Sequence, residues 1–299
     1  MRAADIPRLN LITLRLFVAA CEEQSISGAA MREHIAASAL SRRLSELEAA
    51  LGLTLFRRHK RGLAPTPSAL VLLRHARIIM SGMAVMAEEL AEHSGGMRGT
   101  IRLHANIWAI TQYLPDQLSS FLAEHPHVVV EVEESLTPAT LKALTERTTD
   151  IGIIGGNVAA SALRMIPYRK DRLVVIMPSD HALALRSTLK LVDLVPYDFI
   201  GARVGSALYQ LIMTGAAGLG ATLKIRIRIS GLETMFRLVE AGLGLGLVPS
   251  GAALRHSRLM NFAAVPLDEP WAERQLSICV AAGQPLSMPT RMFLDHLQG

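Results

Sequence analysis

The sequence predicts an α/β protein with an all-α domain at its N-terminus, one long helix after it, and a C-terminal α/β domain made of two subdomains. Three observations support this prediction. Apolar residues recur every three or four positions near the N-terminus, a heptad-like apolar pattern follows, and strand-like and helix-like segments alternate from residue 98 onward. A chain of 299 residues is too long for one ordinary core. We therefore expect an N-terminal domain over 1–66, a linker helix over 67–97 and a C-terminal domain over 98–299.

Basic charge is concentrated in the N-terminal part of the chain. Residues 1–77 hold 12 Lys and Arg against 6 Asp and Glu, whereas residues 78–299 hold 19 against 20. This asymmetry favours a polyanion-binding module attached to a nearly neutral body. A basic face that contacts only solvent is the alternative.

Cys21 and Cys279 are the only cysteines, and they fit neither a disulfide framework nor the spacing of zinc ligands. They fit a reducing cytoplasm and buried apolar positions. No segment reaches about 18 uncharged apolar residues, the length of a membrane span. The first residues carry charges where a secretory signal would be apolar. We therefore expect a soluble, cytoplasmic protein that does not enter a membrane.

Two short helices are predicted at the start of the basic region. The first carries its apolar residues three or four positions apart on one stripe: Leu11, Leu14, Phe17 and Val18. The second begins near Ser27, where a hydroxyl ahead of GAAMREH can cap free backbone N–H groups.

A third helix is predicted after Ile35, and Gly52 ends it as a C-terminal glycine. Its apolar residues recur at the helical period: Leu40, Leu44, Leu47 and Leu51. Hydroxyls and arginines lie on its other faces: Ser38, Ser41, Arg42, Arg43 and Ser45. The second and third helices therefore form a helix-turn-helix whose second helix can lie in a major groove. Arginine can bind guanine O6 and N7, and serine can contact bases or phosphates.

The segment LFRRHKRGLAPT after the third helix predicts a short β-hairpin, or wing. Its five potential cations precede Gly62 and Pro65: Arg57, Arg58, His59, Lys60 and Arg61. Wings of this kind reach phosphates or the minor groove. A solvated basic loop is the alternative, but the position directly after a helix-turn-helix favours DNA contact.

These segments resemble the N-terminal domain of LysR-type transcriptional regulators. The matching residues are Leu14, Phe17, Ser27, Ala29, Ala30, Ser41, Arg42, Leu47, Glu48, Leu51, Gly52, Leu55, Phe56 and Arg58. The family usually opens its recognition helix with Ser-Gln-Pro, whereas this chain has Ala36, Ala37 and Ser38, so a glutamine contact to DNA is lost. The usual Thr-x-Ala-Gly after the wing reads Thr66, Pro67, Ser68 and Ala69. The candidate DNA-binding residues are Ser27, Ser38, Ser41, Arg42, Arg43, Arg57, Arg58, Lys60 and Arg61.

The linker helix carries an apolar seam with steps of four and three residues. Its members are Ala69, Leu73, Ala76, Met80, Met83, Ala87 and Leu90, and HSGGMRG ends the helix. The resemblance implies that this helix pairs antiparallel with a second copy and joins two DNA-binding domains. Simple core packing is the alternative.

The C-terminal domain alternates strands and helices. TIRLHA, VVVEVEE and DIGII are strand-like, and two helical segments separate them, an order that implies a parallel, doubly wound sheet. A second unit repeats this order with DRLVVIMPS, YDFIGA, LKIRIRIS and LGLVPSG, before a late strand RQLSICVAA and a last helix PTRMFLDHL. We expect subdomain I at about 98–168 and 270–299, and subdomain II at about 169–269. The resemblance continues here through DIGI, LVDL and VEAGLGLGLVPSG. It implies an effector domain similar to periplasmic solute-binding proteins.

A ligand site is expected in the cleft between the two subdomains, because ligands of open parallel sheets lie beyond the carboxyl ends of the strands. Helix N-termini there supply N–H donors, which favours a small anion, most simply a carboxylate. The candidate effector-binding residues are Asn106, Ile107, Trp108, Ser135, Arg203, Val204, Gly205, Ser206 and Leu232. Each polar member has the alternative role of an ordinary N-cap. Arg203 could instead cover the surface, and Trp108 could instead fill the core.

No motif supports catalysis. The order helix, glycines, strand in AGLGLGLVP is the reverse of a dinucleotide-binding turn, and the histidines fall in no zinc or nucleophile motif. We therefore expect a non-enzymatic, effector-responsive transcriptional regulator without a metal or other cofactor, which binds double-stranded DNA as a dimer of dimers. The alternative is a solute-binding or enzymatic α/β protein with a basic N-terminal extension.

Overall fold

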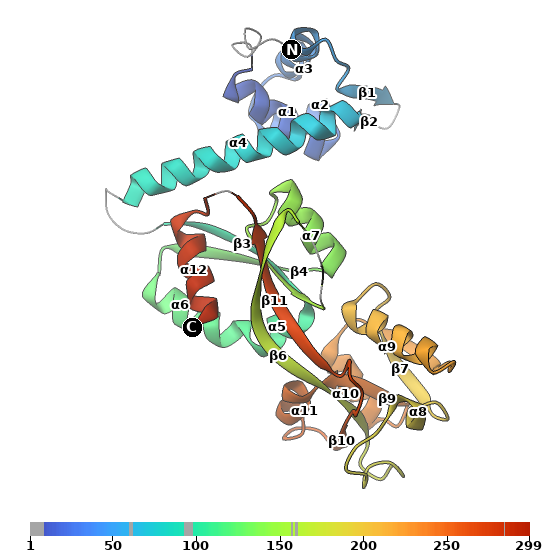
Figure 1. The fold of residues 1–299 in the computed structure, drawn as a ribbon. Coiled ribbons are helices and arrows are strands. Elements are labelled where there is room, and N and C mark those ends of the chain that lie inside the picture. Colours follow the sequence, from blue (N-terminus) through green and yellow to red (C-terminus); the bar gives the residue numbers. More distant parts are fainter. Residues whose placement is uncertain (1–8, 60–61, 93–97, 157, 159–160, 284) are drawn as a thin grey trace. The chain divides into compact units, whose positions relative to one another are not determined.

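The computed structural model of the chain describes residues 9–59, 62–92, 98–156, 158, 161–283 and 285–299 (Figure 1). The chain divides into two compact units, Met1–Gly95 and Gly96–Gly299. The elements of the N-terminal unit are α1 (Leu11–Glu23), α2 (Ile26–Arg32), α3 (Ala37–Leu51), β1 (Phe56–His59), β2 (Gly62–Pro65) and α4 (Pro67–Glu92).

Helices α1 to α3 form the predicted helix-turn-helix around a small apolar core. Leu14, Phe17, Leu40, Leu44 and Leu47 are buried in it, as their spacing predicts. Leu11 was expected on the same stripe, but it is the first residue of α1 and stays 42% exposed. Gly52 ends α3 with a φ of +64°, which confirms its role as the C-terminal glycine.

The expected cap of α2 is wrong by two residues. The hydroxyl of Ser25 accepts the N–H of Gly28 at 3.2 Å, so Ser25 is the N-cap. Ser27 lies inside the first turn of α2 and is exposed. Ser25 fits this role because its backbone is extended, as an N-cap requires.

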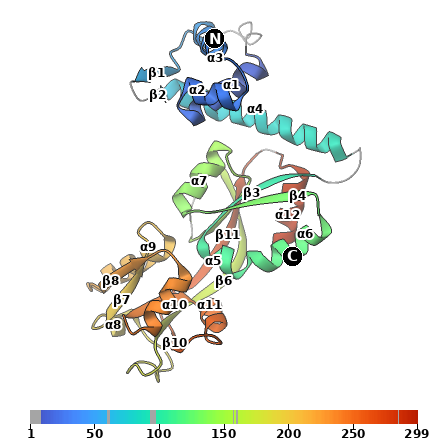
Figure 2. The ribbon, with the colours of Figure 1, turned by 180° about the vertical axis from the view of Figure 1, so that it is seen from behind.

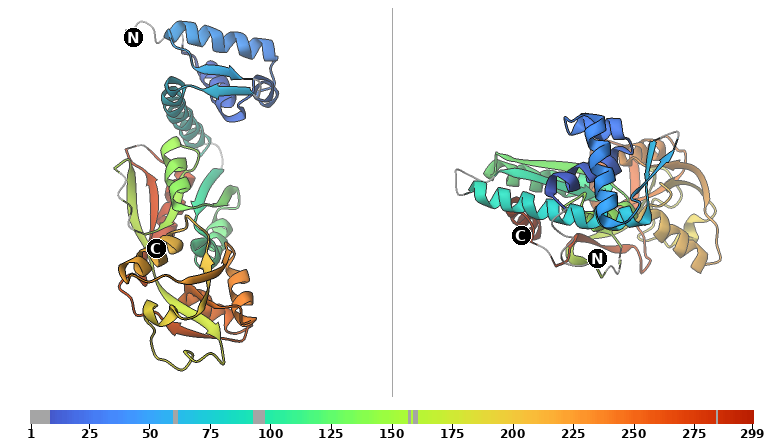
Figure 3. Two further views of the ribbon diagram at one scale, coloured as in Figure 1. Left: turned by 90° about the vertical axis from the view of Figure 1, so that its right-hand side faces the viewer. Right: turned by 90° about the horizontal axis from the view of Figure 1, so that it is seen from above.

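The wing is an antiparallel pair of β1 and β2, with Phe56 opposite Pro65 and His59 opposite Gly62. The Leu63 N–H donates to the carbonyl of Gln24 at 2.7 Å, which fixes the hairpin beside α1 (Figure 3). A Cβ at Gly62 would lie 2.5 Å from that carbonyl oxygen, so only glycine fits there.

Glu48 fixes the entry into the wing from α3. Its Oε1 atom accepts the N–H groups of Leu55 at 2.7 Å and Phe56 at 3.1 Å. The Leu-Glu pair that carries part of the family resemblance therefore has a structural role.

The first half of helix α4 packs into the core of its own unit. Ala69 and Ala76 are fully buried, and Leu73 packs against the same cluster, so this part of the predicted seam belongs to the N-terminal core. Met83 and Leu90 are exposed. The alternative of simple core packing therefore applies to the first half of α4.

Pro67–Ala87 of α4 is long and apolar enough to cross a membrane by length and composition alone, although it includes Arg74 and Arg77.

The C-terminal unit combines strands and helices from the whole second part of the chain. Its strands are β3 (Gly99–Ala105), β4 (Val128–Glu134), β5 (Ile151–Gly155), β6 (Leu163–Pro178), β7 (Asp198–Ala202), β8 (Lys224–Ile229), β9 (Leu245–Pro249), β10 (Phe262–Pro266) and β11 (Glu273–Ala281). Its helices are α5 (Ile107–Gln112), α6 (Leu114–Glu124), α7 (Thr137–Glu146), α8 (Leu191–Leu194), α9 (Ala207–Gly218), α10 (Leu232–Glu240), α11 (Ser250–His256) and α12 (Met288–Gln298).

The strand order is β4-β3-β5-β11-β6-β9-β7-β8, and β10 pairs with β6. Pairing is parallel among β3, β4 and β5 and among β7, β8 and β9, as predicted. It is antiparallel where β11 meets β5 and β6, and where β6 meets β9 and β10. The predicted parallel, doubly wound pairing therefore does not extend to the centre of the sheet, where the long strands β6 and β11 run antiparallel to their neighbours (Figure 1).

Helices cover both faces of each half of the sheet (Figure 2). In subdomain I, α6 and α12 pack on one face and α7 on the other. In subdomain II, α8 and α9 pack on one face and α10 and α11 on the other. The mixed α/β class and its two subdomains agree with the sequence-based prediction.

Candidate DNA-binding surface and effector pocket

The recognition helix α3 presents exposed polar side chains. Ser38 is exposed in its first turn, and Ser41 is half-buried. The Arg42 Nε atom lies 2.8 Å from Oε1 of Glu46, with the two side chains 82% and 60% exposed. A pair this exposed contributes only about 0.3–0.5 kcal/mol. Arg42 can therefore leave Glu46 for a DNA base at little cost.

The other candidate DNA-binding residues differ in their exposure and contacts. Arg43 turns toward α1, where its Nη1 donates to Oγ1 of Thr13 at 3.5 Å. Arg57 is exposed on β1. The backbone of Arg58 lies in β1, opposite Leu63. The Arg58 side chain and the expected contacts of Lys60 and Arg61 lie outside the described residues.

An ion network joins the linker helix to the helix-turn-helix. Glu22 of α1 accepts from Arg77 of α4 at 2.9 Å and from Arg32 of α2 at 2.8 Å. Burial alone would raise the pKa of the Glu22 carboxyl, but hydrogen bonds from the two arginines outweigh it and lower the pKa. Glu22 is therefore charged at neutral pH and holds α4 against α1 and α2.

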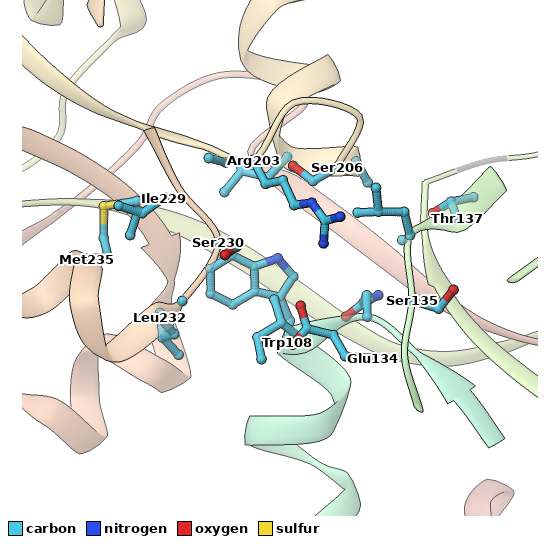
Figure 4. A pocket seen from close by; sticks show the side chains of 18 of the residues that line it. Trp108, Glu134, Ser135, Thr137, Arg203, Ser206, Ile229, Ser230, Leu232 and Met235 are labelled. Atoms are coloured by element: carbon cyan, nitrogen blue, oxygen red, sulfur yellow. The ribbon is translucent and has the colours of Figure 1, made fainter. Parts of the chain in front are cut away.

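A pocket lies between the two subdomains of the C-terminal unit (Figure 4). Seven of the nine predicted effector-binding residues line it: Asn106, Ile107, Trp108, Ser135, Arg203, Ser206 and Leu232. Val204 and Gly205 do not. Val204 is 58% exposed to solvent, and Gly205 has a φ of +86° that turns the chain into α9.

Several lining residues were not predicted: Glu134, Leu136, Thr137, Gly155, Ala202, Ala207, Leu208, Ile229, Ser230, Gly231, Met235, Arg274 and Leu276. Thr137 and Gly231 belong to strand-to-helix junctions that the sequence indicates. Glu134 is the last residue of an acidic edge strand, and Arg274 is the second residue of a late strand, so neither position carries a local signal of a binding site.

Two polar lining residues are used as helix caps. The Asn106 Oδ1 atom accepts the N–H of Ala109 at 2.9 Å, and the Ser206 Oγ atom accepts the N–H of Tyr209 at 3.1 Å. The alternative N-cap role therefore applies to both side chains. Within the described part of the chain, the hydroxyls of Ser135, Thr137 and Ser230 make no hydrogen bond and remain open to a ligand.

Trp108 connects the two subdomains. It lies in α5 of subdomain I, lines the pocket, and packs against the core clusters on both faces of subdomain II. The two roles considered for Trp108, pocket wall and core filling, therefore coexist.

A buried ion pair lies where β6 and β11 cross between the subdomains. Arg274 of β11 donates through Nη2 to Oδ2 of Asp171, its register partner on β6, and also lines the pocket. Burial raises the pKa of the Asp171 carboxyl, and Arg274 offsets part of that rise. Asp171 Oδ1 and Arg274 Nε have no partner within the described residues.

No group of three or more His, Cys, Asp or Glu side chains in the described ranges is arranged to hold a metal ion.

Two features together define a class of protein. One is a winged helix-turn-helix with an exposed arginine on its second helix, and the other is a two-subdomain α/β unit with a central pocket. They define a DNA-binding regulator with a domain for small-molecule effectors.

Comparison with known proteins identifies the family. A profile described as "Bacterial regulatory helix-turn-helix protein, lysR family" matches residues 11–70, and one described as "LysR substrate binding domain" matches residues 94–299. The chain belongs to the LysR family of transcriptional regulators, which are not enzymes. Members of this family bind DNA and small effectors and form oligomers.

Similar proteins span nearly the whole chain. The uncharacterized HTH-type transcriptional regulator YbhD of Escherichia coli K12 is 29% identical over 96% of this chain and 90% of YbhD. The transcriptional dual regulator GltC of Bacillus subtilis is 25% identical over 97% of this chain and 96% of GltC.

Solved structures show the same fold. A variant of full-length OxyR from Pseudomonas aeruginosa matches with a TM-score of 0.78 and 21% identity, over 97% of this chain and 93% of OxyR. Full-length CbnR in complex with its target DNA matches with a TM-score of 0.65 and 19% identity, over 97% of this chain and 99% of CbnR.

Proposed function

We propose that the chain is a cytoplasmic regulator whose effector is a small organic anion, most simply a carboxylate, bound between subdomains I and II. The observation that carries this proposal is Arg203, whose guanidinium extends into the pocket (Figure 4). The guanidinium of Arg203 has no ion pair or hydrogen bond within the described residues. Gly231, which also lines the pocket, is the N-cap of α10 and provides no side-chain cap, so N–H donors are also available.

On the DNA side, we assign base reading to α3 and phosphate contact to the wing. Ser38, Ser41 and Arg42 are the proposed base-reading residues, and the proposed backbone contacts are Ser27, Arg43, Arg57, Arg58, Lys60 and Arg61. The exposure of Arg42 and the weakness of its pair with Glu46 support this assignment. We expect a dimer or tetramer to occupy the operator, because the recognition helices of symmetric pairs read two half-sites.

A redox signal is a second class of effector, since a structure of Corynebacterium glutamicum OxyR contains bound H2O2. The cysteines of this chain do not favour it. Cys21 and Cys279 are 6% and 0% exposed, and burial raises the pKa of each thiol to about 12. Neutral, buried thiols are poor nucleophiles, so we do not assign them a sensing role.

The carboxylate proposal is tested by thermal unfolding of the full-length protein with a panel of small carboxylates. A ligand at about 100 times its Kd should stabilise the folded state by about 2.7 kcal/mol. Arg203→Gln should abolish that stabilisation, because it removes the cation and keeps a polar side chain. Substitution of Asn106 or Ser206 would be a poorer test, since loss of a helix cap alone costs about 1 kcal/mol.

Arg226→Gln is the matched control, because Arg226 is an exposed arginine of subdomain II that pairs with Asp198 at 2.9 Å outside the pocket. Equal stabilisation of the wild type and Arg203→Gln by every active carboxylate would contradict the proposed site. If no compound with a carboxylate group, zwitterions included, stabilises the wild type, the effector class itself is wrong.

A further inference from the structure

The pocket contains an acidic side chain that a simple anion leaves without a partner. Glu134 is the last residue of β4 and lines the pocket. Its strand neighbours Glu131 and Glu133 pair with Arg102 at 3.7 Å and His104 at 3.3 Å on β3. The side-chain carboxylate of Glu134 has no ion pair or hydrogen bond within the described residues. Its carboxylate is therefore available to a ligand.

The unpaired positive charge comes from the opposite subdomain. Arg203 and Glu134 extend into the pocket from opposite sides, with the Trp108 ring beside them (Figure 4). No ion pair joins them in the described structure. Arg274, the second arginine in the lining, is already neutralised by Asp171. The pocket thus offers one unpaired cation from subdomain II and one unpaired anion from subdomain I.

These two charges disfavour a ligand that carries only a carboxylate. Such a ligand would pair with Arg203 but would bring its negative charge into the same pocket as Glu134, where like charges repel and Glu134 loses water without gaining a partner. A ligand that carries an ammonium group as well satisfies both side chains. Ser135, Thr137 and Ser230 add hydroxyls that can bind either group.

The rest of the pocket wall is apolar, and it suits a hydrocarbon side chain. Ile107, Trp108, Ile229, Leu232 and Met235 supply aliphatic, aromatic and thioether surface. We infer that the effector is a zwitterion with an apolar side chain, of which an apolar α-amino acid is the simplest form. This inference rests on the proposed carboxylate effector and adds the ammonium group and the apolar side chain to it.

The two charges also explain how such a ligand would act on the domain. Glu134 and Arg203 lie on different subdomains, so a zwitterion binds both at once. A ligand with one charge binds one subdomain only. Because a ligand shifts a conformational equilibrium only through its differential affinity, the bridging ligand favours the closed arrangement more strongly.

The inference is tested by isothermal titration calorimetry on the full-length protein with matched ligands. The probes are the apolar α-amino acids from alanine to tryptophan, together with two partial analogues each of leucine and phenylalanine. The analogues lacking the ammonium are 4-methylpentanoate and 3-phenylpropionate, and those lacking the carboxylate are 3-methylbutylamine and 2-phenylethylamine. We expect one or more of the amino acids to bind about tenfold more tightly than its analogues that lack either charge. The reason is that each hydrogen bond to a charged group contributes more than about 1.4 kcal/mol, which corresponds to a tenfold change in Kd.

Two variants then assign the charges to residues. Glu134→Gln should weaken amino-acid binding about tenfold and leave the binding of the corresponding carboxylate unchanged or stronger. Glu133→Gln is the matched control, since Glu133 neighbours Glu134 but pairs with His104 and lies outside the pocket. It should change neither affinity.

The inference is overturned if carboxylates bind as tightly as the amino acids, if Glu134→Gln weakens both classes equally, or if no amino acid binds. In each of these cases, a carboxylate that binds the wild type and not Arg203→Gln still supports the proposed function. If neither class binds, both ideas are wrong.

Discussion

Arg274 and Asp171 show how one buried pair can serve both the fold and the pocket. Their side chains are 5% and 1% exposed, and each retains one polar atom without a partner in the described structure. Burying two charges costs several kcal/mol, which their attraction only partly offsets. A hydrophobic pair would be at least as stable at this place. The position between both subdomains and next to the ligand pocket suggests that the pair specifies how β6 and β11 align.

Removing the cation alone should therefore be costly, and the cost should depend on pH. Arg274→Gln leaves the Asp171 carboxylate buried without a counter-charge, so we expect a loss of about 3–5 kcal/mol near pH 7.5. Burial already raises the pKa of Asp171 in the folded state, and loss of Arg274 raises it further. A folded-state pKa above the unfolded value means that stability falls as pH rises through that range, so the loss should be smaller at pH 5.

Urea unfolding at both pH values measures this effect. The proteins compared are the wild type, Arg274→Gln, and the double variant that combines Asp171→Asn with Arg274→Gln. The double variant replaces two charges by two amides and should regain most of the stability at pH 7.5. A single variant as stable as the double variant at pH 7.5 would show that Asp171 is not stabilised by Arg274.

At the scale of elements, helix α4 carries two different apolar surfaces. Its first turns are held in the N-terminal core by Ala69 and Ala76 and by the ion pair from Arg77 to Glu22. Its later turns expose a stripe spaced by four, three and four residues: Ile79, Met83, Met86 and Leu90. This spacing is that of a helix-pairing seam. The part of the predicted seam beyond Met80 therefore remains the proposed dimer contact.

Changing both methionines of this stripe should weaken self-association. Met83→Lys with Met86→Lys places two charges where apolar side chains would be buried, and loss of each methionine contact should cost about 2 kcal/mol. Each such loss corresponds to roughly thirtyfold weaker association. Sedimentation equilibrium over a range of protein concentrations measures it. Leu185→Lys, at a residue 99% exposed outside α4, is the control and should leave the association unchanged.

The elements also show what sequence could and could not predict. Local signals located the helix-turn-helix, the wing and most strands, because apolar spacing and residues such as Gly52 act within a few positions. The extra length of β6 and its antiparallel pairing with β11 depend on residues about a hundred positions apart, such as Asp171 and Arg274. The presence of Glu134 opposite Arg203 in the pocket was also not predicted. In the sequence, Glu134 is one of several glutamates in a strand, a pattern that indicates only a solvated edge strand.

At the scale of the whole molecule, any coupling between effector and operator acts equally on the binding of both. The chain connects its two units through α4 and the residues that follow it. The coupling therefore has to pass through a conformational equilibrium of the subdomains that also affects the DNA-bound form. Free-energy linkage makes this effect reciprocal, and couplings of about 1–3 kcal/mol are typical.

We therefore expect the Kd of the effector to change by about 5- to 150-fold when the operator is bound, and the Kd of the operator to change by the same factor when the effector is bound. Calorimetric titration of the effector into free and operator-bound protein measures the first factor, and gel shifts with and without the effector measure the second. We also expect the effector to change how the protein sits on DNA, so DNase footprints under the same conditions should show a changed protected region. Arg203→Gln should bind the operator normally and show none of these responses. An effector whose Kd is the same with and without operator, together with an unchanged footprint, would show that the pocket is not coupled to DNA binding.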